Sequence, residues 1–230
     1  HSTSSAASDV YKRQFFGTIG SIVFGILAAQ LVNQKFFGRT FMRSILLFPY
    51  VGPVVALAYT WELLLDPYSG TLNNLLLNFQ VIQEPLNLLG QKYLTINFFG
   101  FDLKLRLALT TVIIFEIWRY FPLAFLFILA RLQAIPKELY EAADVDGAGP
   151  VQKFVSITLP QITAVISILF MIRFIWNFNK FEDIFLLTGG ASGTRTLPIN
   201  VYEQGFSIGD IGMGSAVSMV IVLLLLFFML

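Results

Sequence analysis

Long, continuous apolar stretches alternate with polar connections along this chain of 230 residues. Stretches of roughly 17–25 apolar residues are long enough to cross the hydrocarbon core of a bilayer as helices. Their apolar residues follow one another without the strict alternation of barrel strands, which favours helices. The pattern predicts an all-α, polytopic transmembrane helical bundle with about five spans: Phe15–Val32, Ser44–Leu65, Leu105–Ala130, Phe154–Trp176 and Gly212–Leu230.

Prolines interrupt several of these stretches. Pro49 and Pro53 lie inside the second, Pro122 in the third and Pro160 near the start of the fourth. Membrane helices tolerate proline where neighbouring groups satisfy the freed carbonyls. We expect ordinary kinking at Pro49 and Pro53.

The composition agrees with a membrane protein. Charged residues make up 13% of the chain, against about a quarter in soluble domains. We therefore expect the chain to be embedded in a lipid bilayer. The chain has no Cys and one His, which excludes disulfide scaffolds, Cys-based metal centres and catalytic sites that need several histidines. We therefore expect no catalytic and no metal-binding residues. The net charge of +1 gives no basic surface for nucleic acid.

The two ends of the chain stand apart from the pattern. Residues 1–14 are polar and Ser-rich and have no apolar core, so they are not a secretory signal. We expect a non-native or disordered tail there, with His1 a tag-like residue rather than a ligand. The sequence stops inside the apolar run Val217–Leu230. We therefore expect residues 15–230 to be a transmembrane domain truncated at both ends.

Positive charge is denser in two of the four connections between spans. The basic residues of the first and third connections are Lys35, Arg39, Arg43, Arg131, Lys137 and Lys153. The other two connections are longer and hold only Lys92, Lys104, Lys180 and Arg195. We expect the chain to lie in the cell membrane (inner or plasma membrane). By the positive-inside rule, the first and third connections lie on its cytoplasmic side.

The third connection holds the most informative segment, residues 136–160. Pro136 is suited to open a helix because its missing N–H costs nothing in the first turn. Gly147 is suited to end that helix, and Gly149-Pro150 to begin the next. The sequence predicts a short helix at the cytoplasmic surface, with two adjacent alanines that let another protein pack closely.

Residues 141–160 follow the pattern EAA-x3-G-x9-I-x-L-P. Its defined positions are Glu141, Ala142, Ala143, Gly147, Ile157, Leu159 and Pro160. The pattern resembles the signature of permease subunits of binding-protein-dependent ABC importers. Segments such as WELLLDPYSGTLN and WNFNKFEDIFLLTGG are similar to the sugar-importing, maltose-type branch of that family.

The resemblance implies a type I importer permease with a six-helix core, of which this chain carries about five helices. It implies that the EAA loop is a coupling helix that docks on an ATPase subunit. Glu141 would bond within that interface, the two alanines would permit close approach, and Gly147 would set the turn. The implied partners are a second homologous permease, two ATP-binding subunits and an extracytoplasmic solute-binding protein.

The chain has no phosphate-binding loop of the form G-x4-G-K-[ST], since its nearest glycine cluster, GGASGTRT, has no Lys. We therefore expect a transport subunit rather than an enzyme, with no cofactor of its own. ATP and Mg are expected to bind to the partner ATPase.

Polar residues at membrane depth are costly, and they face a cavity or one another. By resemblance to the sugar branch, the residues of the substrate pathway are Glu116, Tyr120, Leu123, Arg173, Trp176, Asn177 and Lys180. Aromatic rings beside amide and charged groups suit a sugar, and Asn177 is the strongest single candidate. A structural role is an equal alternative: Trp176 can belong to an interfacial belt, and Arg173 and Lys180 can pair with Glu116, Glu182 or Asp183.

We therefore expect a permease subunit of an ATP-driven importer for a sugar or related polyol. A phosphorylated polyol is an alternative solute, given Arg173 and Lys180. An ion-coupled secondary transporter is a second alternative, although the sequence shows no inverted repeats or paired broken helices. A membrane-embedded enzyme has little support, because no paired carboxylates occur at catalytic spacing.

Overall fold

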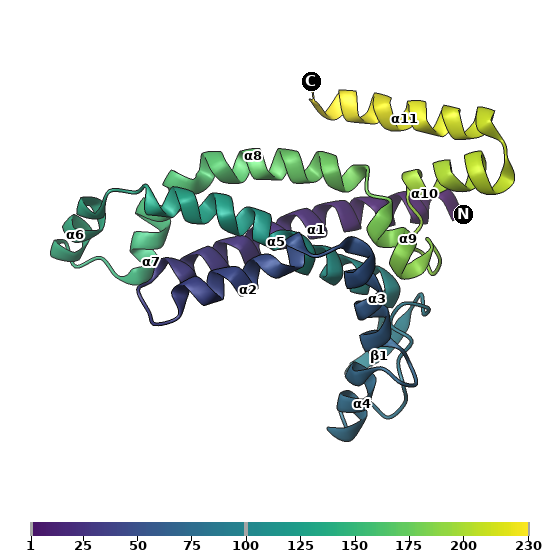
Figure 1. Ribbon diagram of the computed structural model, residues 1–230, viewed down its shortest axis with the longest axis horizontal. Coiled ribbons are helices and arrows are strands. Elements are labelled where there is room, and N and C mark those ends of the chain that lie inside the picture. The colour runs from purple at the N-terminus through teal and green to yellow at the C-terminus, as the bar shows by residue number, and fades with distance from the viewer. Residues whose placement is uncertain (1, 99–100, 230) are drawn as a thin grey trace. The chain divides into compact units, whose positions relative to one another are not determined.

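The computed structural model describes residues 2–98 and 101–229. Its elements are almost all helices, in agreement with the all-α prediction (Figure 1). The chain divides into two compact units. The first comprises residues up to Phe16, Gly52–Glu116 and residues from Ile175 onward, and the second comprises Gly17–Val51 and Ile117–Phe174. Three long helices contribute to both units: α1 (Ser2–Asn33), α5 (Leu107–Gln133) and α8 (Leu159–Phe178).

The second unit is a bundle of α2 (Arg39–Val51) and its parts of the three long helices (Figure 1). Gly25 brings α1 close to α5, since a Cβ at that position would lie 2.6 Å from the Cβ of Ala124. Small residues commonly permit such close packing between membrane helices. The buried core cluster comprises Ile22, Ala29, Val32, Phe121, Ala124, Phe125, Ile128, Leu129, Leu132, Ile135, Ile162 and Leu169.

At one end of this bundle the chain forms the predicted pair of short helices. They are α6 (Lys137–Val145) and α7 (Pro150–Lys153), and a π-helical turn, η1 (Phe154–Thr158), leads from α7 directly into α8. Pro136 directly precedes α6, and Pro150 is the first residue of α7. Both helix starts therefore agree with the sequence prediction, because proline fits the first turn.

The first unit contains α3 (Val54–Leu65), α4 (Thr71–Asn78) and an antiparallel hairpin of β1 (Leu94–Phe98) and β2 (Phe101–Leu105), in which Leu94 is opposite Leu105. The sequence predicted only a connection where the hairpin lies. The signal was present, because LTINF and FDLKL alternate apolar and polar residues as strands do. The remaining elements of this unit are α9 (Glu182–Thr188), α10 (Leu197–Tyr202), the π-helical turn η2 (Glu203–Ile208) and α11 (Ile211–Met229).

Among the described residues, three helical stretches are long and apolar enough to span a membrane: Arg13–Asn33, Leu107–Gln133 and Pro150–Phe178. They match the first, third and fourth predicted spans. The second predicted span, Ser44–Leu65, is divided between α2 and α3, which are long enough to span a membrane only as a pair with a break between them. Pro53 at this break has a ψ of 129°, which is extended, whereas Pro49 lies inside α2. The described candidate spans therefore number three, or four with the broken pair, rather than five.

The fifth predicted span, Gly212–Leu230, corresponds to the shorter apolar helix Ile211–Phe227, and Leu230 lies outside the described residues. Helix α1 begins at Ser2, so it includes most of the polar segment 1–14, while His1 lies outside the described residues. The predictions of a foreign or disordered tail and of truncation at both ends stay predictions.

Candidate functional site

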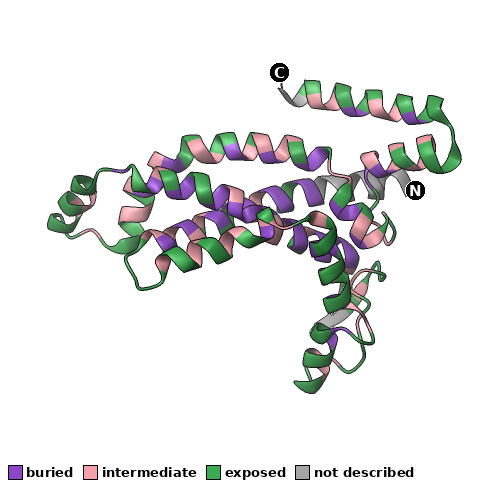
Figure 2. Ribbon diagram, in the orientation of Figure 1, coloured by how far each residue is buried: buried purple, intermediate pink, exposed green. Residues whose placement is uncertain are grey.

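Helix α6 carries the first half of the EAA pattern on an open surface. None of the residues Lys137–Val145 is buried, and Figure 2 shows α6 in green and pink. Leu139 is 42% exposed and Val145 is 89% exposed. Glu141 and Ala142 are exposed, and Ala143 is half-buried. Apolar and acidic groups on one short helix therefore form a surface that a second protein can contact.

The turn after α6 has the hydrogen bonds of a Schellman motif. The N–H of Gly147 donates to the carbonyl of Asp144 at 3.1 Å, and the N–H of Ala148 donates to the carbonyl of Ala143 at 2.8 Å. Gly147 has a φ of +74°, in the left-handed region that glycine adopts without strain. A Cβ there would meet no atom within 4 Å, so the backbone conformation alone accounts for glycine.

The second half of the EAA pattern lies in η1 and at the N-terminal end of α8. Ile157 packs against the core cluster, whereas Leu159 and Pro160 are exposed. The seven predicted coupling residues therefore form two groups. One is an outward-facing helix and turn, and the other lies where the chain enters the bundle.

In the first unit, Arg13 joins two of the predicted pathway residues, Glu116 and Asn177, both fully buried. The guanidinium of Arg13 forms an ion pair with Glu116, and its Nη2 donates to the backbone carbonyl of Asn177 at 2.8 Å. Arg13 belongs to the polar segment 1–14, so its pairing with Glu116 could not be predicted from the span pattern.

The buried side-chain amide of Asn177 has no hydrogen-bond partner among the described residues, at either its oxygen or its nitrogen. Buried polar groups are nearly always hydrogen-bonded, and exceptions are found at functional sites. A polar solute could satisfy this amide. Asn177 stays the strongest predicted pathway residue.

Lys180 makes the structural contact that the sequence offered as an alternative. Its Nζ lies 3.6 Å from Oδ2 of the buried Asp183, one turn further along the chain. The same stretch borders a cavity of about 340 Å³, lined by Trp176, Asn179, Lys180, Phe181 and Glu182. Trp176 is 46% exposed at this cavity. The cavity places aromatic rings beside an amide and charges of both signs, which suits a polyhydroxylated solute.

In the second unit, Arg173 lies over the ring of Tyr120, with 4.1 Å between its Cζ and the ring centre. Arg119 lies near the same ring at 5.4 Å, and Tyr50 of α2 contacts it edge-on with ring centres 6.4 Å apart. Cations within about 6 Å of a ring centre are attracted by its negative face. Leu123 is half-buried and lies one turn beyond Tyr120 on α5. The structure thus brings Tyr120 and Arg173 into direct contact.

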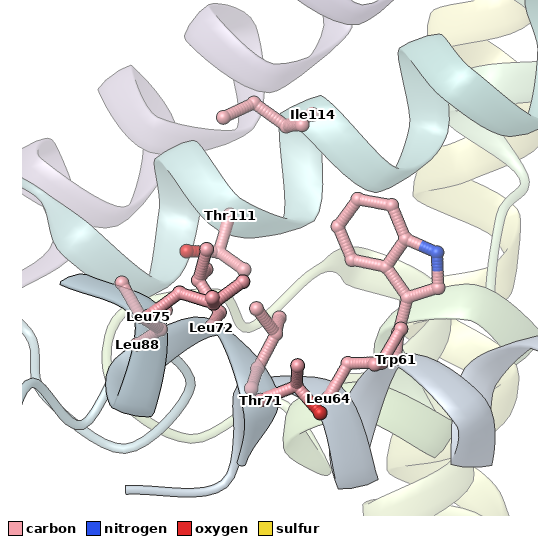
Figure 3. Close-up of a pocket in the computed structure, with 9 residues that line it drawn as sticks. Trp61, Leu64, Thr71, Leu72, Leu75, Leu88, Thr111 and Ile114 are labelled. Carbon is pink, nitrogen blue, oxygen red and sulfur yellow. The ribbon is translucent and has the colours of Figure 1, made fainter. Parts of the chain in front are cut away.

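A second cavity in the first unit has a different chemistry (Figure 3). It has a volume of about 390 Å³ and is lined by Trp61, Leu64, Leu65, Thr71, Leu72, Leu75, Leu88, Thr111 and Ile114. The hydroxyl of Thr111 donates to the carbonyl of Leu107 in its own helix at 3.0 Å. The walls are otherwise mostly aliphatic, so this cavity offers few of the polar groups that a sugar requires.

Two aromatic residues at these sites, Tyr50 and Phe181, were not among the predicted site residues. Tyr50 could have been noticed as an aromatic with a polar tip beside Pro49 in an apolar stretch. Phe181 gave no such signal, because the chain has 24 Phe residues and most fill apolar surface. In the described part of the chain, no group of three or more His, Cys, Asp or Glu side chains could hold a metal ion.

Comparison with known proteins places these features in a family. Residues 21–230 match the family model described as "Binding-protein-dependent transport system inner membrane component". The chain is 35% identical over 206 residues to the inner membrane ABC transporter permease protein YcjO of Escherichia coli (strain K12), covering 90% of this chain and 65% of that protein. It is also 35% identical over 207 residues to the trehalose/maltose transport system permease protein MalF of Thermococcus litoralis, again covering 90% and 65%. The chain thus spans just under two thirds of these relatives' length.

A third relative is the sn-glycerol-3-phosphate transport system permease protein UgpA of Yersinia pestis, 34% identical over 212 residues, with 90% of this chain and 66% of that protein covered. The fold is similar to that of a chain in the crystal structure of a bacterial ABC transporter involved in the import of alginate. The TM-score is 0.77 at 22% identity, over 97% of this chain and 76% of that chain. The resemblance drawn from the EAA pattern is confirmed: the chain belongs to the family of binding-protein-dependent transport system inner membrane components.

Proposed function

We propose that this chain is the transmembrane permease subunit of an ATP-driven importer and lines the translocation pathway for a sugar or related polyol. The observation that carries the proposal is the outward-facing helix α6. It is followed by a turn in which Gly147 has a φ of +74°, and then by a second helix that continues into the bundle. An exposed helix that continues through a short turn into a membrane helix suits the coupling of a docked ATPase to the bundle.

The proposed coupling surface consists of the exposed EAA residues. Glu141 bonds to the ATPase, Ala142 and Ala143 allow close approach, and Gly147 fixes the turn. Ile157, Leu159 and Pro160 hold the N-terminal end of α8 in position. The density of basic residues near residues 136–160 supports a cytoplasmic position for this loop.

The proposal assigns ATP and Mg to the partner ATPase, because this chain has no phosphate-binding loop. The complete complex would contain a second homologous permease, two ATP-binding subunits and an extracytoplasmic solute-binding protein. The description of the matched family, a binding-protein-dependent transport system, supports the last of these partners.

The proposed pathway residues of the first unit are Asn177 and the lining of the cavity beside Trp176 and Lys180. Those of the second unit are Tyr120, Leu123 and Arg173. A sugar is favoured because the cavity beside Trp176 offers aromatic faces together with hydrogen-bonding groups. The relative named for trehalose and maltose transport supports the same solute class. A phosphorylated polyol is the alternative, supported by the relative named for sn-glycerol-3-phosphate and by the cation of Lys180 beside the cavity.

The test is uptake by the complete transporter reconstituted in vesicles, with ATP supplied on the cytoplasmic side. Radiolabelled maltose, trehalose and sn-glycerol-3-phosphate are offered in turn together with the cognate binding protein. We expect ATP-dependent uptake of a sugar, which Asn177→Leu abolishes and Asn177→Gln partly retains. Uptake of sn-glycerol-3-phosphate alone would favour the alternative solute. Uptake driven by an ion gradient without ATP would contradict the proposal.

A further inference from the structure

One contact between side-chain hydroxyls joins the exposed helix α6 to the end of η1. Tyr140 Oη and Thr158 Oγ1 lie 2.8 Å apart, within hydrogen-bond distance. Thr158 is only 4% exposed, and the Tyr140 ring packs against the core cluster. Tyr140 is therefore the side chain of α6 that reaches inward, while its neighbours Leu139 and Glu141 face outward.

The other contact from α6 to the following helix has a different character. Lys153 forms an ion pair with Asp144, whose side chain is 64% exposed. Ion pairs at exposed positions contribute little because water and salt screen them. The hydroxyl contact of Tyr140 is shielded on the Thr158 side, so it is the stronger of the two links.

Thr158 is the last residue of the π-helical turn η1. The N–H of Leu159 donates to the carbonyl of Phe154, five residues back, instead of four. Pro160 follows and has no N–H to donate, so it cannot close an α-helical turn onto Ser156. Turns of this kind are wider than α-helix, are rare, and are frequently found at functional sites.

On the far side of the π turn, α8 is fixed to α5. Arg131 Nε donates to the backbone carbonyl of Gln161 at 3.0 Å, and its Nη2 donates to Gln161 Oε1 at 2.5 Å. The last residue of the π turn, Thr158, is therefore attached to α6, and Gln161, three residues further along, is attached to α5. A displacement of α6 relative to α5 must be taken up in the few residues between them.

We propose that Tyr140 and Thr158 are positioning residues that pass movement of the coupling helix to α8, and that the junction between η1 and α8, residues 158–161, takes up this movement. The inference rests on the proposed function, because it requires an ATPase that moves α6. It goes beyond the docking role of the EAA surface, since neither residue belongs to the defined positions of the pattern.

The test uses the complete transporter in lipid nanodiscs and measures hydrogen–deuterium exchange with and without a non-hydrolysable ATP analogue. In the wild type, the analogue should change exchange both in α6 and in residues 154–161. Tyr140→Phe keeps the packed ring and removes the hydroxyl, and Thr158→Val removes its partner. Each should leave the response of α6 intact and reduce that of residues 154–161 by roughly 2- to 10-fold, the range expected for one hydrogen bond.

The controls separate a transmitting role from a structural one. Thr158→Ser keeps the hydroxyl and should respond like the wild type. Thr163→Val removes an exposed hydroxyl that donates to the carbonyl of Leu159 in its own helix, and should also respond like the wild type. The double variant Tyr140→Phe/Thr158→Val should be no worse than either single variant.

Two results would overturn the inference while leaving the proposed function standing. One is an unchanged response of residues 154–161 in Tyr140→Phe, and the other is an equal loss in α6 and in residues 154–161, which would mean that docking itself had failed. If the analogue changes nothing in α6 of the wild type, the proposed function and this inference fail together.

Discussion

The guanidinium of Arg173 stacks on the ring of Tyr120, with 4.1 Å between Cζ and the ring centre. The two side chains come from different helices, α8 and α5, and both are buried. The contact therefore links two membrane helices through an attraction that water does not screen.

Replacing Tyr120 tests this contact. Tyr120→Phe keeps the aromatic face, so we expect it to lower the melting temperature less than Tyr120→Leu does. Tyr120→Leu removes it and should cost about 1–2 kcal/mol of stability beyond the loss of packing. The control is Phe121→Leu, which removes a neighbouring buried ring over which the described contacts place no cation. Thermal unfolding in detergent measures all three variants, and equal losses in Tyr120→Leu and Phe121→Leu would contradict the cation–π account.

The turn at Gly147 gives a second prediction. Gly147→Ala must adopt a positive φ and should cost about 1–2 kcal/mol, whereas Gly149→Ala has a φ of −71° and open space for a Cβ. We therefore expect Gly147→Ala to weaken co-purification of the ATPase and Gly149→Ala to leave it unchanged. Gly147→Pro also removes the N–H that donates to Asp144 and should abolish uptake with the fold largely intact. Normal uptake by Gly147→Pro at normal expression would count against the coupling role.

The close approach of α1 and α5 gives a third prediction. A Cβ at Gly25 would lie 2.9 Å from the backbone nitrogen of Phe125 as well as against Ala124, so a helix must shift. A Cβ at Gly20 would meet the side chain of Ile117, which can rotate away. Gly25→Ala should destabilise the protein by about 1–3 kcal/mol, and Gly20→Ala by clearly less. The melting temperatures of the two variants are measured in the same detergent. A lower melting temperature for Gly20→Ala than for Gly25→Ala would contradict the close packing at Gly25.

The acidic turn after α3 gives a prediction on pH. Hydrogen bonds from the backbone N–H and side-chain hydroxyl of Ser69, and from the N–H of Tyr68, lower the pKa of Asp66 below its usual 3.8. Because the folded pKa is the lower one, the stabilisation is complete above pH 3.8 and is lost as the pH falls through the folded value. Asp66→Asn should melt below the wild type at pH 6, and the difference should shrink below pH 3.8. A difference that stays constant from pH 6 to pH 3 would show that the charge is not involved.

Much of the coupling loop could be predicted because its signals are local. Pro136, Gly147 and Pro150 each fix the backbone by their own chemistry, so the start and end of the two short helices follow without tertiary information. The apolar stretches similarly predict long helices, since each is long enough to cross a bilayer.

The remaining features depend on contacts between distant segments. The pairing of Arg13 with Glu116 joins residues 103 positions apart, and no pattern within one helix indicates it. The sequence predicted a kink at Pro53, whereas the structure has a break there. Proline in a membrane helix is compatible with both, so the residue alone does not distinguish them. The π turn before Pro160 and the contact of Tyr140 with Thr158 both arise from how the loop folds back on the bundle.

The central claim is that this chain couples a partner ATPase to a membrane pathway. The most direct measurement is gentle extraction of the complete protein from its native membrane, followed by mass spectrometry of the chains that purify with it. The account predicts an ATP-binding subunit, a second homologous permease and an extracytoplasmic binding protein whose ligand names the solute. A chain that purifies alone and still moves solute into vesicles without ATP would contradict it.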